Sequence, residues 1–337
     1  MSKLNEKQII DMFISKLWKY NLTRSGKDDV AVIQLPKDVN IRDTSSIILT
    51  CDMLVESTDV PAGAMRPWQI ARKSIVASIS DLSSKGIRPY VSLVSIGLPK
   101  KYSKSKIENL ICGFHRASKE FGFKIVGGDT NQSSELVIDC SMIGFANNNT
   151  HIPTRNGAKP GDLIVVSGEF GYSLSGLKIL EDHAKAQNSK FKNKAISSVT
   201  NPKPPQLFGS LIARHFSSSM DCTDGLAITL YELARQSRVN FLIDNIPSVK
   251  DVKEFAHYNH LDIKDLIFYG GEEYEIVATI NPSKLEKVKS IAKRSKLKLF
   301  VVGRVEKGEG KVFVINEIRK KYSELDERGY IHFANSL

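Results

Sequence analysis

The sequence is poor in cysteine and has no long apolar run. Its four cysteines, Cys51, Cys112, Cys140 and Cys222, lie far apart and form no Cys-x-x-Cys pair. We therefore expect free thiols in a reducing cytoplasm and no zinc site. No stretch approaches the roughly 20 apolar residues that span a bilayer, and the charged beginning MSKLNEKQII lacks a signal-peptide core. These absences predict a cytoplasmic protein without membrane association.

Common nucleotide-binding and catalytic signatures are also missing. The sequence has neither GxGxxG nor GxxxxGK[ST], so a Rossmann or P-loop site is not expected. The seven histidines are scattered, and no Ser-His-Asp set is visible from spacing. The segment SGEFGYSLSGL at 167–177 leaves two interpretations open. Its backbone N–H groups hold a phosphate, or it is only a tight strand-to-helix turn.

The bulk composition is that of a globular protein. With 337 residues, 41% hydrophobic and 25% charged, the chain has room for two domains of about 150 residues. The net charge of +11 fits a solvated lysine-rich surface or one that attracts anions such as nucleotides. Basic runs at 100–106 and 293–300 are not interleaved with aromatic residues as a stacking surface would be. Nucleic acid is therefore not an expected partner.

The first half of the chain alternates strands and helices. A helix is predicted over 67–85, because Pro67 suits a first helical position and apolar residues then recur at helical spacing up to Leu82. A second helical pattern runs from Ile107 to Phe121, and Gly122 ends it. Strand-like runs cover 29–35, 45–51, 90–98 and 135–145.

A turn-rich segment at 147–162 is the best domain boundary. We expect domains at 1–148 and 149–337, each with α/β layers, and hence an α+β protein. The second half again alternates strand-like runs with helical patterns, and its polar, lysine-rich stretch 183–205 is predicted to be a mobile loop. The predicted helices of this half are 173–186, 204–215, 225–237, 249–257 and 283–295.

Carboxylates recur beside apolar runs and near turns. In VGGDTNQ (126–132), a strand is predicted to end in an acid on a glycine hinge. Asp81 falls in the last turn of helix 67–85, where the macrodipole disfavours an anion by about 0.3–1 kcal/mol, so it is a functional candidate. The other acids of this kind are Asp28, Asp29, Asp52, Asp129, Asp221 and Asp224.

Two explanations of these acids stay open at this point. Each acid alone fits turn chemistry or helix capping. If several converge, each close pair repels by roughly 4 kcal/mol at an effective dielectric of about 20, and the cluster needs cations. Hard carboxylate oxygens favour Mg²⁺ or Ca²⁺ over zinc. Spacing in the sequence cannot show that the acids meet.

Motifs of the first half resemble those of thiamine-monophosphate kinases. DDVAVI at 28–33 is similar to their GDDAAV, and TCDMLVESTDVP at 50–61 is similar to TDML-VEG. ARKSIVASISDLSSKGIRP at 71–89 resembles the helix KALAVNLSDLAAMGARP, and IVGGDTNQ at 125–132 contains their GGDT motif.

Motifs of the second half continue the resemblance in the same order. RNGAKPGD at 155–162 resembles RSGAKPGD, and the strand and glycine-rich turn that follow resemble TG-LG-SAAGL. MDCTDGLAITL at 220–230 is similar to IDISDGLASDL, YGGEEYEIVATI at 269–280 to SGGEDYELLFT, and GYIHF at 329–333 to GYDHF. The match extends from about residue 26 to residue 333, which makes it highly specific.

The resemblance implies the PurM-like fold of the aminoimidazole-ribotide-synthetase-like superfamily, with an N-terminal and a C-terminal α/β domain. It also implies a homodimer formed by the N-terminal domains, with ATP bound near their interface. The implied reaction transfers a phosphate group from ATP to thiamine monophosphate, with several Mg²⁺ ions and no covalent phosphoenzyme. The acceptor phosphate is largely ionised at neutral pH, so no single catalytic residue is assigned.

Carried over position by position, the resemblance assigns residues to the metal, the nucleotide and the acceptor. The implied nucleotide contacts are Gly128, Asp129, Arg155 and Thr223. The implied acceptor contacts are Asp59, Glu272 and Glu327. The implied magnesium ligands are Asp29, Thr50, Asp52, Asp81, Asp129 and Asp221, with Asp224 close by.

Three departures from the family pattern concern the acceptor pocket. Many members have His at the position of Asp59 and Trp at that of Glu327, and Glu273 replaces the Asp of GGED. Glu272 is retained and is implied to contact the thiamine moiety. One hypothesis is that Asp59 or Glu327 complements the cationic thiazolium.

Two rival functions remain at this point. One is a related enzyme of the same superfamily with a different acceptor, such as a ribotide synthetase, a selenophosphate synthetase or a hydrogenase-maturation carbamoyl dehydratase. The other is a non-catalytic protein that binds nucleotide or RNA through its basic surface. Acids at every implied metal position argue against this second rival.

Overall fold

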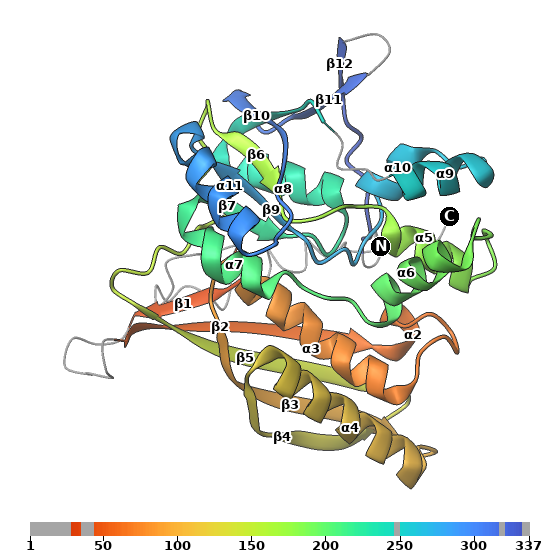
Figure 1. The fold of residues 1–337 in the computed structure, drawn as a ribbon. Coiled ribbons are helices and arrows are strands. Elements are labelled where there is room, and N and C mark those ends of the chain that lie inside the picture. Colours follow the sequence, from red (N-terminus) through yellow and green to blue (C-terminus); the bar gives the residue numbers. More distant parts are fainter. Residues whose placement is uncertain (1–27, 35–43, 246–249, 317–320, 332–337) are drawn as a thin grey trace, which may run out of the picture.

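The computed structural model describes residues 28–34, 44–245, 250–316 and 321–331, which form two β-sheets with helices packed against each (Figure 1). The α+β class predicted from the sequence is confirmed. The first sheet ends at Asn147 and the second begins at Leu163, while the division between residues 148 and 149 stays a prediction. Within the described ranges, none of the helices has the length and apolar character needed to cross a membrane.

The first sheet has the strand order β1-β2-β5-β3-β4, in which β3 and β4 are parallel and the other neighbours antiparallel. All four strands predicted in this half are present, and β2 is longer than expected. The strands are β1 (Ala31–Gln34), β2 (Thr44–Val55), β3 (Pro89–Pro99), β4 (Lys124–Ser133) and β5 (Val137–Asn147).

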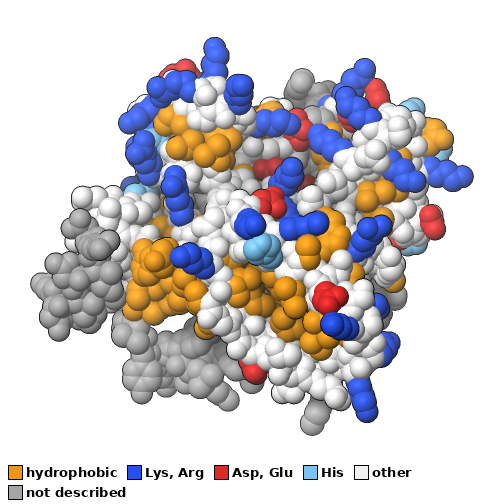
Figure 2. Space-filling view, turned by 60° about the horizontal axis from the view of Figure 1, so that its bottom comes forward, with side chains coloured by type: hydrophobic (Ala, Val, Ile, Leu, Met, Phe, Trp, Pro, Cys, Tyr) orange, Lys and Arg blue, Asp and Glu red, His pale blue; other side chains and the backbone are white. Residues whose placement is uncertain are grey.

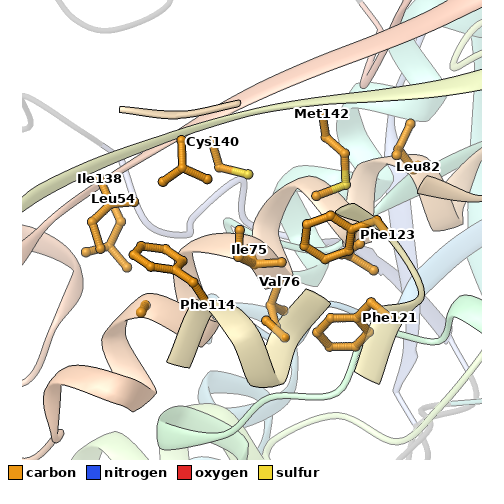
Figure 3. Packing of buried hydrophobic residues seen from close by; sticks show 14 of the residues in the cluster. Leu54, Ile75, Val76, Leu82, Phe114, Phe121, Phe123, Ile138, Cys140 and Met142 are labelled. Atoms are coloured by element: carbon orange, nitrogen blue, oxygen red, sulfur yellow. The ribbon is translucent and has the colours of Figure 1, made fainter. Parts of the chain in front are cut away.

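Two helices, α3 (Pro67–Ser84) and α4 (Lys104–Phe121), cover one face of this sheet, and a short α2 (Glu56–Asp59) follows β2 (Figure 1). Both predicted helices are confirmed, with Pro67 at the first position of α3 and Gly122 ending α4 in a left-handed conformation (φ 75°). Figure 3 shows the core beneath them, where Ile75 and Phe114 lie among side chains of the sheet such as Ile138.

Helix α3 is buried on nearly all sides because it lies between the first sheet and the second half of the chain. It packs on β2 and β5, and it also contacts β7 and α7. The backbones come close, since a Cβ on Gly209 of α7 would lie 2.0 Å from the carbonyl oxygen of Ser83. Polar side chains buried in such a position need partners, and α3 buries Arg72 and Lys73, with Lys85 at its C-cap.

The second sheet has the order β12-β11-β8-β10-β6-β9-β7, with only β8 and β11 parallel among these neighbours. Its strands are β6 (Leu163–Val166), β7 (Phe216–Asp221), β8 (Val239–Ile243), β9 (Ile276–Ile280), β10 (Phe300–Lys307), β11 (Val312–Asn316) and β12 (Lys321–Glu324). The helices of this half are α5 (Tyr172–Leu180), α6 (Ser189–Thr200), α7 (Gln206–Ile212), η1 (Ala213–His215), α8 (Leu226–Ser237), α9 (Lys250–Tyr258), α10 (Ile263–Phe268), η2 (Pro282–Lys284) and α11 (Leu285–Arg294).

The prediction of a mobile loop over 183–205 was wrong, because this stretch contains α6. Asn188 caps the helix by accepting from Phe191 N at 2.8 Å. Phe191, Ala195 and Val199 recur every four residues and are all buried. Phe191 also stacks on Phe255 of α9 with ring centroids 4.9 Å apart. The segment is therefore anchored by an apolar stripe between its lysines.

The predicted glycine hinge in VGGDTNQ was also wrong. Strand β4 continues through Gly127, Gly128 and Asp129 and pairs with β3 along its length. A Cβ on Gly128 would lie 1.8 Å from the carbonyl oxygen of Val94. The glycine is therefore needed for close approach of two strands rather than for a turn.

Candidate active site

Three acids from distant parts of the chain meet where α3 lies against the second sheet. Asp29 precedes β1, Asp81 lies in the last turn of α3, and Asp221 is the last residue of β7. One carboxylate oxygen of each lies within 4.8 Å of the others. The convergence that sequence spacing left open is therefore present, and we call these residues the acid cluster.

Two further predicted residues face the acid cluster from β2. Strand alternation turns Thr50 and Asp52 toward α3, while their neighbours face the opposite side of the sheet. Thr50 Oγ1 donates to Asp81 Oδ2, and Ser78 Oγ on α3 donates to Asp52 Oδ2 at 2.8 Å. Five of the predicted magnesium ligands thus lie together: Asp29, Thr50, Asp52, Asp81 and Asp221.

Burial and mutual repulsion disfavour ionisation of these carboxyls. Burial, reinforced by the charge of Asp29, raises the pKa of Asp221 to about 7. Burial and the charges of Asp52 and Asp221 raise the pKa of Asp81 well above its usual range. Burial also raises the pKa of Asp52. A bound cation would reverse these shifts, because it stabilises the charged forms.

Asp29 differs because two cationic side chains touch it. Lys85 Nζ lies 2.6 Å from Asp29 Oδ2, and Arg155 Nε donates to Asp29 Oδ1 at 2.7 Å. Burial alone would raise the pKa of Asp29, but Arg155 and Lys85 lower it below its usual value. Arg155 also donates its backbone N–H to Asp28 at 3.0 Å. This predicted nucleotide contact is therefore tied into the acid cluster.

The oxygens of the acid cluster suit magnesium. Carboxylates and a threonine hydroxyl are hard ligands of the kind that Mg²⁺ and Ca²⁺ prefer. Asp221 is 2% exposed, and no donor among the described residues reaches its Oδ2. A buried polar atom without a partner is costly, and a cation beside Asp221 would satisfy it.

Asp129 and Gly128 lie away from the acid cluster. Both are on the exposed edge strand β4, which is three strands from β2, or about 14 Å at ordinary strand spacing. Asp129 of the same chain is therefore too far to share an ion with Asp52 on β2, and it is not among the acids whose oxygens lie within 4.8 Å of one another. Its implied role, and that of Gly128, stay predictions.

Thr223 and Asp224 follow Asp221 in the loop between β7 and α8. Thr223 O accepts from Glu272 N at 2.5 Å, and Asp224 O accepts from Tyr330 N at 2.9 Å. Asp224 is not the N-cap of α8, because Gly225 takes that position. The loop therefore joins the acid cluster to the segments that carry Glu272 and Tyr330.

Glu272 and Asp59 are brought together by Lys73, which the sequence analysis did not single out. Lys73 is 2% exposed, and its Nζ lies 2.6 Å from the Asp59 carbonyl oxygen and 2.6 Å from Glu272 Oε1. The Asp59 carboxylate accepts from Val55 N at 2.7 Å. Glu272 and Tyr274 both have a left-handed backbone, with φ of 60° and 55°. Such strain in non-glycine residues is common at functional sites.

Glu327 lies apart from Lys73 and Glu272. Its carboxylate pairs with Arg235 on α8, with Nη1 donating to Oε1 at 2.6 Å. Both side chains are 39% exposed, so the pair is open to solvent. The implied acceptor contact of Glu327 stays a prediction.

The segment SGEFGYSLSGL forms a tight strand-to-helix turn in which two backbone N–H groups bind a carboxyl of the protein. Glu273 Oε1 accepts from Gly171 N at 2.6 Å and from Ser173 N at 3.4 Å. Burial raises the pKa of Glu273 to about 8. A carboxyl of the protein, not a phosphate, therefore binds these two backbone N–H groups at the beginning of α5.

Polar residues of α3 that sequence reasoning missed complete the site. Ser84 Oγ donates to Asp29 Oδ2 at 2.9 Å, Ser78 binds Asp52, and Lys85 binds Asp29. Asp81 lies three positions after Ser78, and Ser84 and Lys85 lie three and four positions after Asp81. This spacing puts them on one helix face. It is the signal in the sequence that could have identified these residues as neighbours of Asp81.

Comparisons with known proteins agree with the motifs. AIR synthase related protein, N-terminal domain, matches residues 27–146, and AIR synthase related protein, C-terminal domain, matches residues 159–316. The thiamine-monophosphate kinase of Nitrosopumilus maritimus (strain SCM1) is 41% identical over 99% of this chain and 100% of its own length. That of Pyrococcus horikoshii is 31% identical over 98% of this chain and 97% of its own length.

Solved structures share the arrangement of both halves. The structure described as AaThiL complexed with AMPPCP and TMP has a TM-score of 0.81 and 26% identity, with 99% of each chain covered. E. coli HypE, a hydrogenase maturation protein, has a TM-score of 0.70 and 16% identity, with 95% of this chain and 96% of that one covered. This second likeness shows the fold alone. The chain belongs to the thiamine-monophosphate kinase family and is built from the two domains of AIR synthase related proteins.

Proposed function

We propose that this chain is an ATP-dependent kinase that phosphorylates thiamine monophosphate to thiamine diphosphate. The observation that carries the proposal is the meeting of Asp29, Asp81 and Asp221, each at a motif position of the family, in one largely buried cluster that Asp52 faces from β2. A relative of the same fold bound to AMPPCP and TMP supports a nucleotide and this acceptor as the two substrates.

The proposed mechanism is direct in-line transfer. An oxygen of the acceptor phosphate attacks the γ-phosphorus of ATP, the bond to the bridging oxygen breaks, and ADP leaves. The acceptor is already an anion at neutral pH, so no strong general base is needed. Several Mg²⁺ ions would neutralise the phosphates and stabilise charge on the transferring group.

The protein's own residues would hold and orient these groups. Asp52, Asp81 and Asp221, with Thr50 beside them, offer oxygen ligands to magnesium in a dry setting. Arg155 is fixed by Asp29 next to the same site, where its charge would attract the nucleotide phosphates. Fixed positions of this kind remove much of the entropic cost of bringing two anions together.

A direct test is ADP release from ATP and Mg²⁺ with and without thiamine monophosphate. We expect release that depends on the acceptor and yields thiamine diphosphate. Asp81→Asn should lower the rate by more than about 100-fold, because outer-shell partners of a metal alone contribute about 10–100-fold. The exposed Glu309→Gln serves as the matched control. ATP binding without acceptor-dependent turnover would instead indicate a different acceptor.

For the acceptor pocket, we propose that Glu272 contacts the cationic thiazolium. Its side chain is 35% exposed and is oriented by Lys73, so it can reach a ligand from a fixed position. The Asp59 carboxylate already accepts a hydrogen bond from the backbone N–H of Val55, which makes it the weaker candidate. Glu272→Gln should raise KM for thiamine monophosphate by about tenfold, the equivalent of about 1.4 kcal/mol. KM for ATP should change little, and equal effects on both would reject the contact.

We also propose a homodimer through the open face of the first sheet. This face exposes Met53, Tyr90, Leu93 and Phe145, with Val126 exposed on the edge strand. Figure 2, which brings the first-sheet end of the molecule forward, shows hydrophobic side chains gathered there. An apolar area of this kind is typical of an interface. In such a dimer, Asp129 would serve a second ion or the partner subunit's site.

The dimer is tested by light scattering of the purified protein during gel filtration. Leu93→Lys should convert a dimer into a monomer, because it puts a charge into the buried centre of the interface. Ile111→Lys is the matched control, since Ile111 is 60% exposed on α4, and α4 covers the other face of the sheet. A wild-type monomer, or a Leu93→Lys dimer, would reject this interface. The expected cytoplasmic location remains a prediction.

A further inference from the structure

Lys85 is a fully buried cation inside the candidate active site. Its side chain is 0% exposed, and it occupies the C-cap of α3. Its Nζ lies 2.5 Å from Asp28 Oδ1, 2.6 Å from Asp29 Oδ2 and 2.7 Å from the carbonyl oxygen of Ser219. An ammonium has three N–H donors, so these three acceptors satisfy it completely.

The carboxylate of Asp29 is surrounded by protein donors. Its Oδ1 accepts from Nε and Nη2 of Arg155, and its Oδ2 accepts from Lys85. Ser84 Oγ lies 2.9 Å from Oδ2 and 2.8 Å from the carbonyl oxygen of Asp81, and these two acceptors compete for its single proton. A carboxylate offers about four lone-pair positions, and three charged donors and this hydroxyl lie around the one of Asp29. A metal ion could bind Asp29 only by displacing one of them.

The other acids of the site have no such cation. In the part of the chain that the structure describes, no lysine or arginine nitrogen forms an ion pair with Asp52, Asp81 or Asp221. Among the described residues, the carboxylates of Asp52 and Asp81 accept from the hydroxyls of Ser78 and Thr50. Asp221, 2% exposed, keeps an oxygen that no described donor reaches. The site therefore divides into a half neutralised by the protein and a half that needs an exchangeable cation.

We propose that Lys85 takes the place of one divalent ion beside Asp28 and Asp29. Metal binding in this chain is then confined to Asp52, Asp81 and Asp221 with Thr50, and Asp29 is not a ligand. The inference rests on the proposed magnesium site and corrects the assignment of Asp29 as one of its ligands. Replacing Lys85 by an uncharged side chain leaves two adjacent carboxylates without a counter-charge, and such an oxygen-lined gap attracts a hard cation.

The experiment counts Mn²⁺ ions bound per chain, by electron paramagnetic resonance, to the full-length protein with AMPPCP. Lys85→Met keeps an unbranched side chain but removes the charge, and it should bind one more ion per chain than the wild type. The double variant Lys85→Met/Asp29→Asn should lose that extra ion. In EDTA, Lys85→Met should melt at a lower temperature than the wild type. Addition of Mn²⁺ should raise the melting temperature of the variant more than that of the wild type.

A matched control is available on the same helix. Lys73 is also buried, but its partners are Asp59 O and Glu272 rather than the acid cluster. Lys73→Met should leave the Mn²⁺ count unchanged. An unchanged or lower count for folded Lys85→Met, or a gain for Lys73→Met as well, would overturn the inference.

The result also separates this inference from the proposed function. A wild type that binds no Mn²⁺ would reject the metal site itself, whereas an equal count for wild type and Lys85→Met would reject only the role of Lys85. If circular dichroism shows that Lys85→Met is unfolded, the Mn²⁺ count of Asp29→Asn tests the inference instead. This variant should keep the wild-type count while Asp221→Asn loses at least one ion, and a loss with Asp29→Asn equal to that with Asp221→Asn would overturn the inference.

Discussion

Repulsion between buried carboxylates is the constraint on which the rest of this site depends. Asp52, Asp81 and Asp221 are drawn from a strand of the first sheet, the helix α3 and a strand of the second sheet. Packing of α3 between the two halves forces them together, although their ionisation is disfavoured there. The apolar contacts that fold the protein thus hold a site that, in our proposal, a cation completes.

Helix α3 links the packing of the fold to the chemistry. One side of it builds the first core through residues such as Ile75 and Ile79. Its polar side chains reach both ends of the site, with Lys73 at the Glu272 end and Ser78, Asp81 and Lys85 at the acid cluster. A single rigid element therefore fixes the distance between the proposed acceptor pocket and the proposed metal site.

Local patterns in the sequence predicted much of the fold, including α3, α4 and four of the five strands of the first sheet. These patterns led to wrong predictions where contacts with distant parts of the chain decide the local structure. Two successive glycines in β4 resembled a hinge, but Gly128 allows the backbone of β3 to approach closely. The many lysines of 183–205 suggested a mobile loop, although Phe191 and Val199 have the apolar spacing of a helix. The family motifs identified the acids, whereas the burial of Lys85 between Asp28 and Asp29 depends on contacts that no spacing reveals.

The central claim, that the acid cluster is held against its own repulsion, is tested by the melting temperatures of wild type and Asp221→Asn across pH. Burial, reinforced by the charge of Asp29, raises the folded-state pKa of Asp221 to about 7 from its ordinary value of 3.8. The folded wild type therefore binds more protons between these values and loses stability as pH rises through this window. In EDTA, we expect Asp221→Asn to be more stable than the wild type by a margin that grows from pH 5 to pH 8. With Mg²⁺ in place of EDTA, we expect the wild type to be the more stable protein at pH 8. A variant that is less stable at every pH, or a margin that does not change with pH, would contradict it.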